Sequence, residues 1–310
     1  MGRVLLVCLA LSAFAFVACD NGNDNGPMVV VSSPEPTSTP FPPTPTSTPI
    51  PSPTETPEPD CQAREESANE LLVDVQAAMA DYPGTWGFAF VDVYCGAVVS
   101  TDPGYRQYAA SAGKIISIVA VLRAVEEGRV AFEEVETSLV NILHVSDDFE
   151  SDYIETFVTA EELNAVIGDA GVVDSTIRGA WRFTNFSAAD LARVWAALVD
   201  GRLLGEELTE WVLARASEAD IPEPYETFPG GVFEHEQLEY GQKAGYYVSD
   251  GVPYFLVGAG YLRNVEMGQA FVPVVLMVTE FADLLEPQRR TVFPLVVEHV
   301  EAVLGFDAAE

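Results

Sequence analysis

Two lysines and two serines are the residues of this chain whose types and spacing could do chemistry. The chain contains 13 arginines but only two lysines, Lys114 and Lys243. An arginine keeps its proton in a protein, whereas a lysine amine can lose it when it is desolvated or lies near another cation. The two lysines are therefore the candidates for a side chain that acts as a base.

Ser111 stands three residues before Lys114, at the start of an apolar run that predicts a buried helix from Ser111 to about Glu127. Residues three apart share a helix face, so the amine should lie beside the hydroxyl as a base beside its nucleophile. To work near neutral pH, the amine pKa must fall from about 10.4 by roughly three units, which burial and a neighbouring Lys243 could cause. The helix start also offers the backbone N–H of Ser111 as half of an oxyanion hole.

Three short motifs follow one another along the chain. They are Ser-Ala-Gly-Lys at 111–114, Ser-Asp-Asp at 146–148 and Lys-Ala-Gly at 243–245. Their order and spacing resemble the S-x-x-K, S-D-N and K-T-G motifs of class A β-lactamases and their penicillin-binding relatives. The resemblance runs from Trp86 to Gly305 and makes the chain similar to a divergent serine hydrolase of that family.

The resemblance implies a role for each motif residue. Ser111 would be the nucleophile that forms an acyl-enzyme with a β-lactam or a related amide or peptide carbonyl, and Lys114 would be its base. Ser146 would pass a proton to the leaving nitrogen, and Lys243 would contact Ser146 and the substrate carboxylate. Tyr246 would supply the second oxyanion N–H. Such a reaction needs no cofactor.

Four residues are expected to bind substrate, namely Asp148, Ala244, Gly245 and Tyr246, and two of them, Asp148 and Ala244, depart from the family pattern. Asp148 replaces an asparagine, so an amide donor becomes a carboxylate that only accepts hydrogen bonds, and it could pair with Lys114 instead. Ala244 lacks the threonine hydroxyl. The segment Val172–Phe186, expected to be the omega loop, contains no glutamate to activate a deacylating water, its only acid being Asp174.

Two functions remain open from these observations. The first is acyl transfer by Ser111, motivated by the retained serines and lysines. The second is a non-catalytic envelope module that binds peptidoglycan peptides or a partner protein, motivated by Asp148, Ala244 and the missing glutamate. A metal site is not expected, because His144, His235 and His299 share no ligand spacing.

The elements that must position these residues can be read from periodicity and capping signals. The predicted strands are Trp86–Tyr94 and Ala97–Val99, which form a hairpin, and Gln242–Val248, Tyr254–Arg263 and Phe271–Thr279. The other predicted helices are Ser67–Ala80, Thr159–Gly168, Ser187–Val199 and Pro287–Leu304, several with a serine or threonine cap. The expected fold is α/β (α+β), with an antiparallel five-stranded sheet built from both ends, flanking helices and an all-α insertion at about 105–225. The resemblance implies the β-lactamase/transpeptidase-like version of this fold.

The N-terminal part carries signals for export. Arg3 precedes an uncharged apolar run at 4–18, which is shorter than the roughly 20 residues of a membrane-spanning helix and is typical of a secretion signal. Residues 16–19 resemble a lipobox, so 1–19 is expected to be a signal peptide with Cys19 lipidated; ordinary cleavage after residues 13–15 and secretion is the alternative. Residues 20–60 are a Pro/Ser/Thr-rich linker, and 61–310 form the hydrolase domain, held outside the cytoplasmic membrane by the lipid anchor.

Charge and cysteines complete the picture. The formal net charge of −33 repels nucleic acid and anionic lipid headgroups, so no nucleic-acid partner is expected. The protein is also expected to be a monomer. Cys61 and Cys95 are expected in the exported domain, where an oxidising compartment permits a disulfide between the first helix and the first hairpin. Two unpaired thiols are the alternative.

Overall fold

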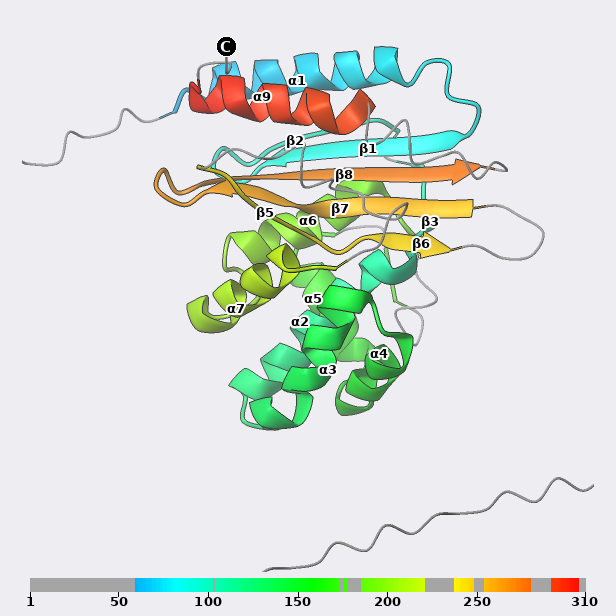
Figure 1. Cartoon of the computed structure of the whole chain (residues 1–310), viewed down its shortest axis with the longest axis vertical. Coiled ribbons are helices and arrows are strands. Elements are labelled where there is room, and N and C mark those ends of the chain that lie inside the picture. Colours follow the sequence, from blue (N-terminus) through cyan, green and yellow to red (C-terminus); the bar gives the residue numbers. More distant parts are fainter. Residues whose placement is uncertain are drawn as a thin grey trace, which may run out of the picture. The chain divides into compact units, whose positions relative to one another are not determined.

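The computed structural model describes residues 59–102, 104–172, 175–177, 185–220, 237–247, 254–279 and 291–306. The predicted signal peptide, Cys19 and nearly all of the predicted linker lie outside the described residues. The described part is a β-sheet with helices on both of its faces (Figure 1).

The sheet is antiparallel throughout its described pairs and is built from both ends of the domain, as predicted. Its strand order is β2-β1-β8-β7-β5, and the short strand β6 also pairs with β7. The strands are β1 Thr85–Asp92, β2 Ala97–Ser100, β5 Glu239–Gln242, β6 Gly245–Tyr247, β7 Tyr254–Asn264 and β8 Gln269–Thr279. The central β8 is buried along almost its whole length because helices cover both faces of the sheet.

The strand predicted at Gln242–Val248 is wrong in one respect, since the chain forms two strands with a break at Lys243–Ala244. Both pieces pair with β7, and the Lys243 N–H still donates to Ala259 O at 3.0 Å. The break leaves both residues of the interruption buried. Val248 lies outside the described residues.

Two helices cover one face of the sheet and the helical insertion covers the other (Figure 1). The first pair is α1 Cys61–Ala78 and α9 Phe293–Leu304. The insertion contains α2 Lys114–Glu126, α3 Phe132–Val145, α4 Asp148–Ile154, α5 Ala160–Asp169, α6 Ala188–Val199 and α7 Glu206–Ser217. It also contains the 3-10 turns η1 Ala110–Gly113 and η2 Glu155–Phe157, and a small ladder of β3 Gln107–Tyr108 with β4 Asn185–Phe186.

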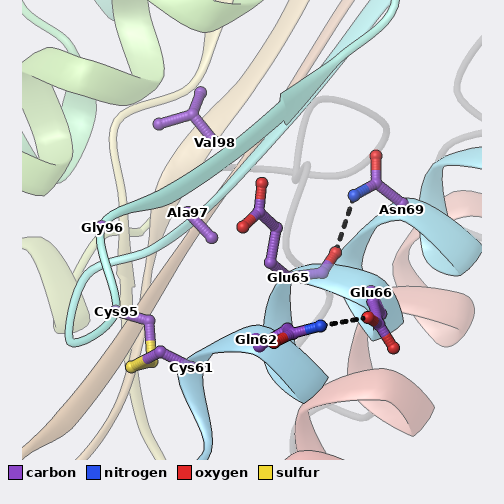
Figure 2. Close-up of a pocket in the computed structure, with 9 residues that line it drawn as sticks. All are labelled: Cys61, Gln62, Glu65, Glu66, Asn69, Cys95, Gly96, Ala97 and Val98. Atoms are coloured by element: carbon purple, nitrogen blue, oxygen red, sulfur yellow. Dashed lines mark hydrogen bonds between the residues drawn. A yellow bond between two sulfur atoms is a disulfide. The ribbon is translucent and has the colours of Figure 1, made fainter.

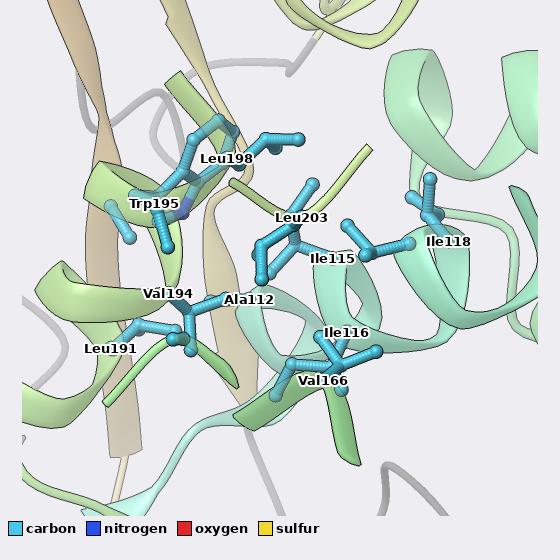
Figure 3. Packing of buried hydrophobic residues seen from close by; sticks show 14 of the residues in the cluster. Ala112, Ile115, Ile116, Ile118, Val166, Leu191, Val194, Trp195, Leu198 and Leu203 are labelled. Atoms are coloured by element: carbon cyan, nitrogen blue, oxygen red, sulfur yellow. The ribbon is translucent and has the colours of Figure 1, made fainter. Parts of the chain in front are cut away.

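The apolar character of α2 follows from its position in the centre of the insertion. Ile115, Ile116 and Ile118 are buried and belong to the same cluster as Trp195 and Leu198 of α6 (Figure 3). Burying each such side chain contributes about 1.5–3 kcal/mol of hydrophobic stabilisation. The helix that carries Lys114 is therefore held rigidly by its neighbours.

Three helix boundaries differ from the sequence predictions. α1 begins at Cys61, because the Asp60 carboxylate caps the N–H groups of Gln62 and Ala63; Ser67 lies inside the helix. Ser111 lies in the turn η1 and not in the first turn of an α-helix, which begins at Lys114. α9 begins at Phe293, and part of the predicted stretch before it lies outside the described residues.

The predicted disulfide between Cys61 and Cys95 is present and joins the start of α1 to the turn between β1 and β2. A groove of about 750 Å³ runs beside it, lined by α1 and the hairpin (Figure 2). None of these elements carries a residue of the predicted active site. Within the described ranges, no helix is long and apolar enough to cross a membrane.

Candidate active site

Ser111 lies in the turn η1, where the chain passes from β3 into the buried helix α2. Its side chain is partly exposed, whereas Ala110, Ala112 and Gly113 around it are buried. Ala110 has a positive φ of 47°, an uncommon conformation for a residue with a Cβ atom. Such backbone strain clusters at functional sites. The turn therefore presents one accessible hydroxyl on an otherwise packed segment.

Gly245 on strand β6 packs directly on this turn. A Cβ atom at Gly245 would lie 2.5 Å from Ala109 O, 2.7 Å from Ala112 N and 3.1 Å from Ser111 N. A real Cβ atom essentially never lies closer than 3.0 Å to another heavy atom, and two of these distances are shorter than that. Glycine, which has no Cβ atom, therefore fits here without displacing the turn. The close approach brings the backbone of the third motif against the backbone N–H of Ser111.

Lys114 begins α2, and its amine is fully buried. Its Nζ donates to Asp148 Oδ1 at 2.5 Å, Ser146 O at 2.7 Å and Asp147 O at 3.3 Å, and lies 3.4 Å from Ser146 Oγ. The first motif is therefore joined to all three residues of the second.

Ser146 ends helix α3 in the left-handed conformation, with φ 61° and ψ 37°. This turn directs both its carbonyl oxygen and its hydroxyl toward Lys114. Lys243 reaches the same hydroxyl from the sheet, with Nζ 2.8 Å from Ser146 Oγ. The Ser146 hydroxyl is thus shared by the two lysines.

Lys243 is also fully buried, and its Nζ lies 3.4 Å from Ala244 O. Burial lowers the pKa of Lys243 well below its usual value, and the nearby charge of Lys114 lowers it further, while Asp148 partly opposes the shift. Strongly shifted pKa values of this kind are concentrated at functional sites.

Asp148 is placed by the short helix α4, which is anchored to its neighbours. The Asp147 carboxylate caps α4 by accepting from Phe149 N and Glu150 N. Ser117 Oγ, one turn after Lys114 on α2, donates to Glu155 Oε1 at 2.5 Å just beyond the helix. These contacts fix both ends of α4 and hold the Asp148 carboxylate over the Lys114 amine.

The other residues predicted to bind substrate lie on β6 and in the break just before it. Ala244 is buried, and Tyr246 is 40% exposed. Tyr247 contacts Tyr108 edge to face at a centroid distance of 5.7 Å, and Phe255 lies 6.2 Å from each of these rings. Sequence reasoning missed Tyr108 and Phe255 as partners of Tyr247. The β6–β7 pairing sets Phe255 opposite Tyr247, and Tyr108 reaches both rings from β3, far away in sequence.

Two further predictions concern residues near the edge of this region. Asp174 in the expected omega loop lies outside the described residues. His144 ends α3 and lies 3.4 Å from Glu218 Oε2 at the end of α7, which suits an ordinary histidine at a helix end. His235 lies outside the described residues, and within the described ranges no three His, Cys, Asp or Glu side chains form a group that could hold a metal ion.

Comparisons with known proteins agree with this architecture. Residues 70–137 match the model of the β-lactamase enzyme family Beta-lactamase2. The matched range includes the Ser111 turn and α2. No curated protein matches the chain at a significant level.

Solved structures with the same fold cover most of the chain. A β-lactamase from Sphaerobacter thermophilus DSM 20745 has a TM-score of 0.61 and 20% identity, over 78% of this chain and 99% of that one. The structure of PBP-A has a TM-score of 0.62 and 19% identity, over 75% and 96%. The extended-spectrum β-lactamase TLA-1 has a TM-score of 0.65 and 11% identity, over 76% and 99%.

At these identities the structural likeness establishes the fold, which is the β-lactamase/transpeptidase-like fold. The chain therefore resembles the class A β-lactamases and PBP-A in fold, and its segment 70–137 matches the β-lactamase family model.

Proposed function

We propose that this protein is a serine hydrolase that forms an acyl-enzyme at Ser111 with a β-lactam or a related amide carbonyl. The observation that carries the proposal is the convergence of the Lys114 and Lys243 amines on Ser146, with Asp148 paired to Lys114. Buried amines within hydrogen-bond reach of a shared hydroxyl are an arrangement for moving protons. A module that only binds a peptide has no need for two buried amines.

The reaction begins with attack of Ser111 Oγ on the carbonyl carbon. The proton of Ser111 goes to a lysine amine of the cluster and is returned to the leaving nitrogen, which opens the amide. The backbone N–H groups of Ser111 and Tyr246 are the proposed oxyanion hole. Gly245 holds these two segments against each other.

Support for the substrate class comes from a relative. A variant of PBP-A, whose structure matches this chain with a TM-score of 0.62 and 19% identity, was solved as an acyl-enzyme complex with penicillin G. We expect the acyl-enzyme of this protein to be hydrolysed more slowly than that of a typical class A β-lactamase. The reason is that the segment Val172–Phe186 contains no glutamate to activate the hydrolytic water.

The test is labelling with a fluorescent penicillin. We expect a covalent adduct that remains after denaturation, is absent from Ser111→Ala and is retained in Ser100→Ala, a serine on β2 outside the site. The absence of an adduct with every β-lactam and activated ester tried would contradict the proposal. Tight binding of muropeptides that is unchanged by Ser111→Ala, without turnover, would favour the non-catalytic alternative.

We also propose that the domain acts outside the cytoplasmic membrane as a lipoprotein. The apolar segment at 4–18 followed by Cys19, and the Cys61–Cys95 disulfide, support export to an oxidising compartment. Mass spectrometry of the mature N-terminus should find a lipid-modified Cys19. An unmodified terminus at Phe16 would contradict the anchor.

A further inference from the structure

The two buried lysines differ in a way that decides which of them can accept a proton. Both Lys114 and Lys243 are completely buried, and both amines lie near Ser146 Oγ. A general base must be uncharged, because only the neutral amine has a free lone pair. The hydrogen-bond partners of each amine show which form the site favours.

The surroundings of Lys114 favour the charged ammonium ion. Asp148 Oδ1, Ser146 O and Asp147 O all lie within 3.3 Å of its Nζ, and each of them can only accept a hydrogen bond. A neutral amine has two N–H groups, whereas an ammonium ion has three. Three acceptors, one of them a carboxylate, therefore match an ammonium ion whose lone pair is gone.

The surroundings of Lys243 favour the neutral amine. Its nearest partner is the Ser146 hydroxyl at 2.8 Å, which can donate as well as accept, and its second partner is Ala244 O at 3.4 Å. Burial and the charge of Lys114 both lower the pKa of Lys243, and Asp148 forms its direct contact with Lys114. An amine with one N–H toward Ala244 O and its lone pair toward the Ser146 hydroxyl satisfies both contacts.

We propose that Lys243 is the base that activates Ser111, acting through the Ser146 hydroxyl, while Lys114 remains a fixed cation paired with Asp148. The proposal rests on the acyl transfer proposed above and reverses the roles that the motif resemblance assigns to the two lysines. Asp148 stands where the family motif has an asparagine, and its carboxylate supplies Lys114 with a counter-ion. This difference explains the reversal.

The proposed step balances without any added reactant. As Ser111 Oγ forms its bond to the carbonyl carbon, its proton passes to Ser146 Oγ and the proton of Ser146 passes to Lys243 Nζ. When the carbon–nitrogen bond breaks, the Lys243 ammonium returns a proton through Ser146 to the leaving nitrogen. Lys114 keeps its proton throughout, and its charge stabilises the negative charge that develops near Ser111.

Matched arginine variants test the assignment. Arginine keeps the positive charge but supplies no proton-accepting lone pair near neutral pH. We measure single-turnover acylation by a fluorescent penicillin in Lys243→Arg and Lys114→Arg. Lys243→Arg should lose roughly 100-fold or more in acylation rate, the usual contribution of a general base, whereas Lys114→Arg should stay within about tenfold of wild type. Equal losses, or the reverse order, would overturn the assignment.

A second readout covers the case in which a buried arginine disturbs folding. In Lys243→Ala, ethylamine should restore part of the acylation rate, and the rescue should rise with pH because the free base is the active form. In Lys114→Ala any rescue should fall with pH, because the ammonium form is needed. Rescue of Lys114→Ala that rises with pH would show that Lys114 is the base.

The two proposals fail in different ways. If the wild-type protein forms no adduct with any β-lactam or activated ester, the proposed function fails. If the adduct forms but depends on the lysines in the opposite order, only the assignment of Lys243 fails.

Discussion

Lys114 Nζ and Asp148 Oδ1 lie 2.5 Å apart, and the two side chains differ in exposure, since the lysine is fully buried whereas Asp148 is 57% exposed. The pair links the interior of the helical insertion to its surface beside the second motif. Asp148 is therefore the counter-ion of a buried charge as well as a residue that an incoming substrate can reach.

Asp148→Asn should destabilise the domain, because Lys114 loses its counter-ion while remaining buried. Breaking a fully buried pair costs about 3–5 kcal/mol, and the exposure of Asp148 reduces our expectation to about 1–2 kcal/mol. Chemical denaturation at neutral pH measures the change. Glu136→Gln, which removes an exposed carboxylate from α3, is the matched control and should change stability by less than about 0.5 kcal/mol. Equal effects of the two substitutions would show that the pair does not stabilise the fold.

Gly245→Ala should damage both stability and acylation, because the new methyl group would meet the backbone of Ala109, Ser111 and Ala112. Overpacking typically costs about 1–3 kcal/mol, and displacing Ser111, the proposed nucleophile, by about 1 Å can cost roughly 100-fold in rate. Thermal melting and fluorescent-penicillin labelling measure the two effects.

Gly168→Ala is the control for this substitution. Gly168 lies on α5 with nothing within 4 Å of the position of an added Cβ atom. Alanine favours a helix over glycine by up to about 1 kcal/mol, so this variant should be as stable as wild type or more stable. A Gly245→Ala variant that behaves like Gly168→Ala would contradict the close contact.

Reduction of the Cys61–Cys95 disulfide should destabilise the domain without affecting acylation. The bond closes a loop with a sequence separation of 34 residues, and cross-links of this length contribute about 2–4 kcal/mol. We expect the melting temperature to fall by roughly 5–15 °C in reductant. The Cys61→Ser/Cys95→Ser variant should melt at the lower temperature with or without reductant. A loss of acylation in parallel would show that the disulfide supports the site.

His299 should make the domain less stable in acid. Burial, and then the charge of Arg64, lower the pKa of His299 from 6.5 to about 4, and its ring contacts Ser67 Oγ and Phe90. Between these pH values the unfolded chain binds a proton at this histidine whereas the folded protein does not. The contribution of His299 to stability is therefore full above about pH 6.5 and falls as the pH drops toward about 4, by up to about 3 kcal/mol.

His299→Gln isolates this contribution from the carboxylates that titrate in the same range. Chemical denaturation of both proteins at several pH values gives the difference in the free energy of unfolding. That difference should shrink as the pH falls from 6.5 to 4. A difference that stays constant with pH would mean that His299 titrates alike in the folded and unfolded states.

Much of the local structure could be predicted because it depends on neighbours in sequence. The Thr159–Glu162 capping box starts α5, Ser187 caps α6, and Cys95-Gly96 turns the first hairpin, as predicted. The sequence offers two capping signals for α1, and the prediction started the helix too late, at Ser67. In the structure the Asp60 carboxylate accepts from the N–H groups of Gln62 and Ala63, so the helix begins at Cys61. Short-range hydrogen bonds decide such boundaries.

The sequence by itself determined which residues could do chemistry, because the scarcity of lysine and the order of the three motifs are properties of the chain alone. It also determined the antiparallel sheet built from both ends, since alternating and apolar runs set the strands. Only the tertiary structure decided that the strand breaks at Lys243, that Gly245 presses on Ser111, and that Asp148 meets Lys114. These relationships join segments more than 30 residues apart, and the protonation of a buried amine depends on every group that such packing brings around it.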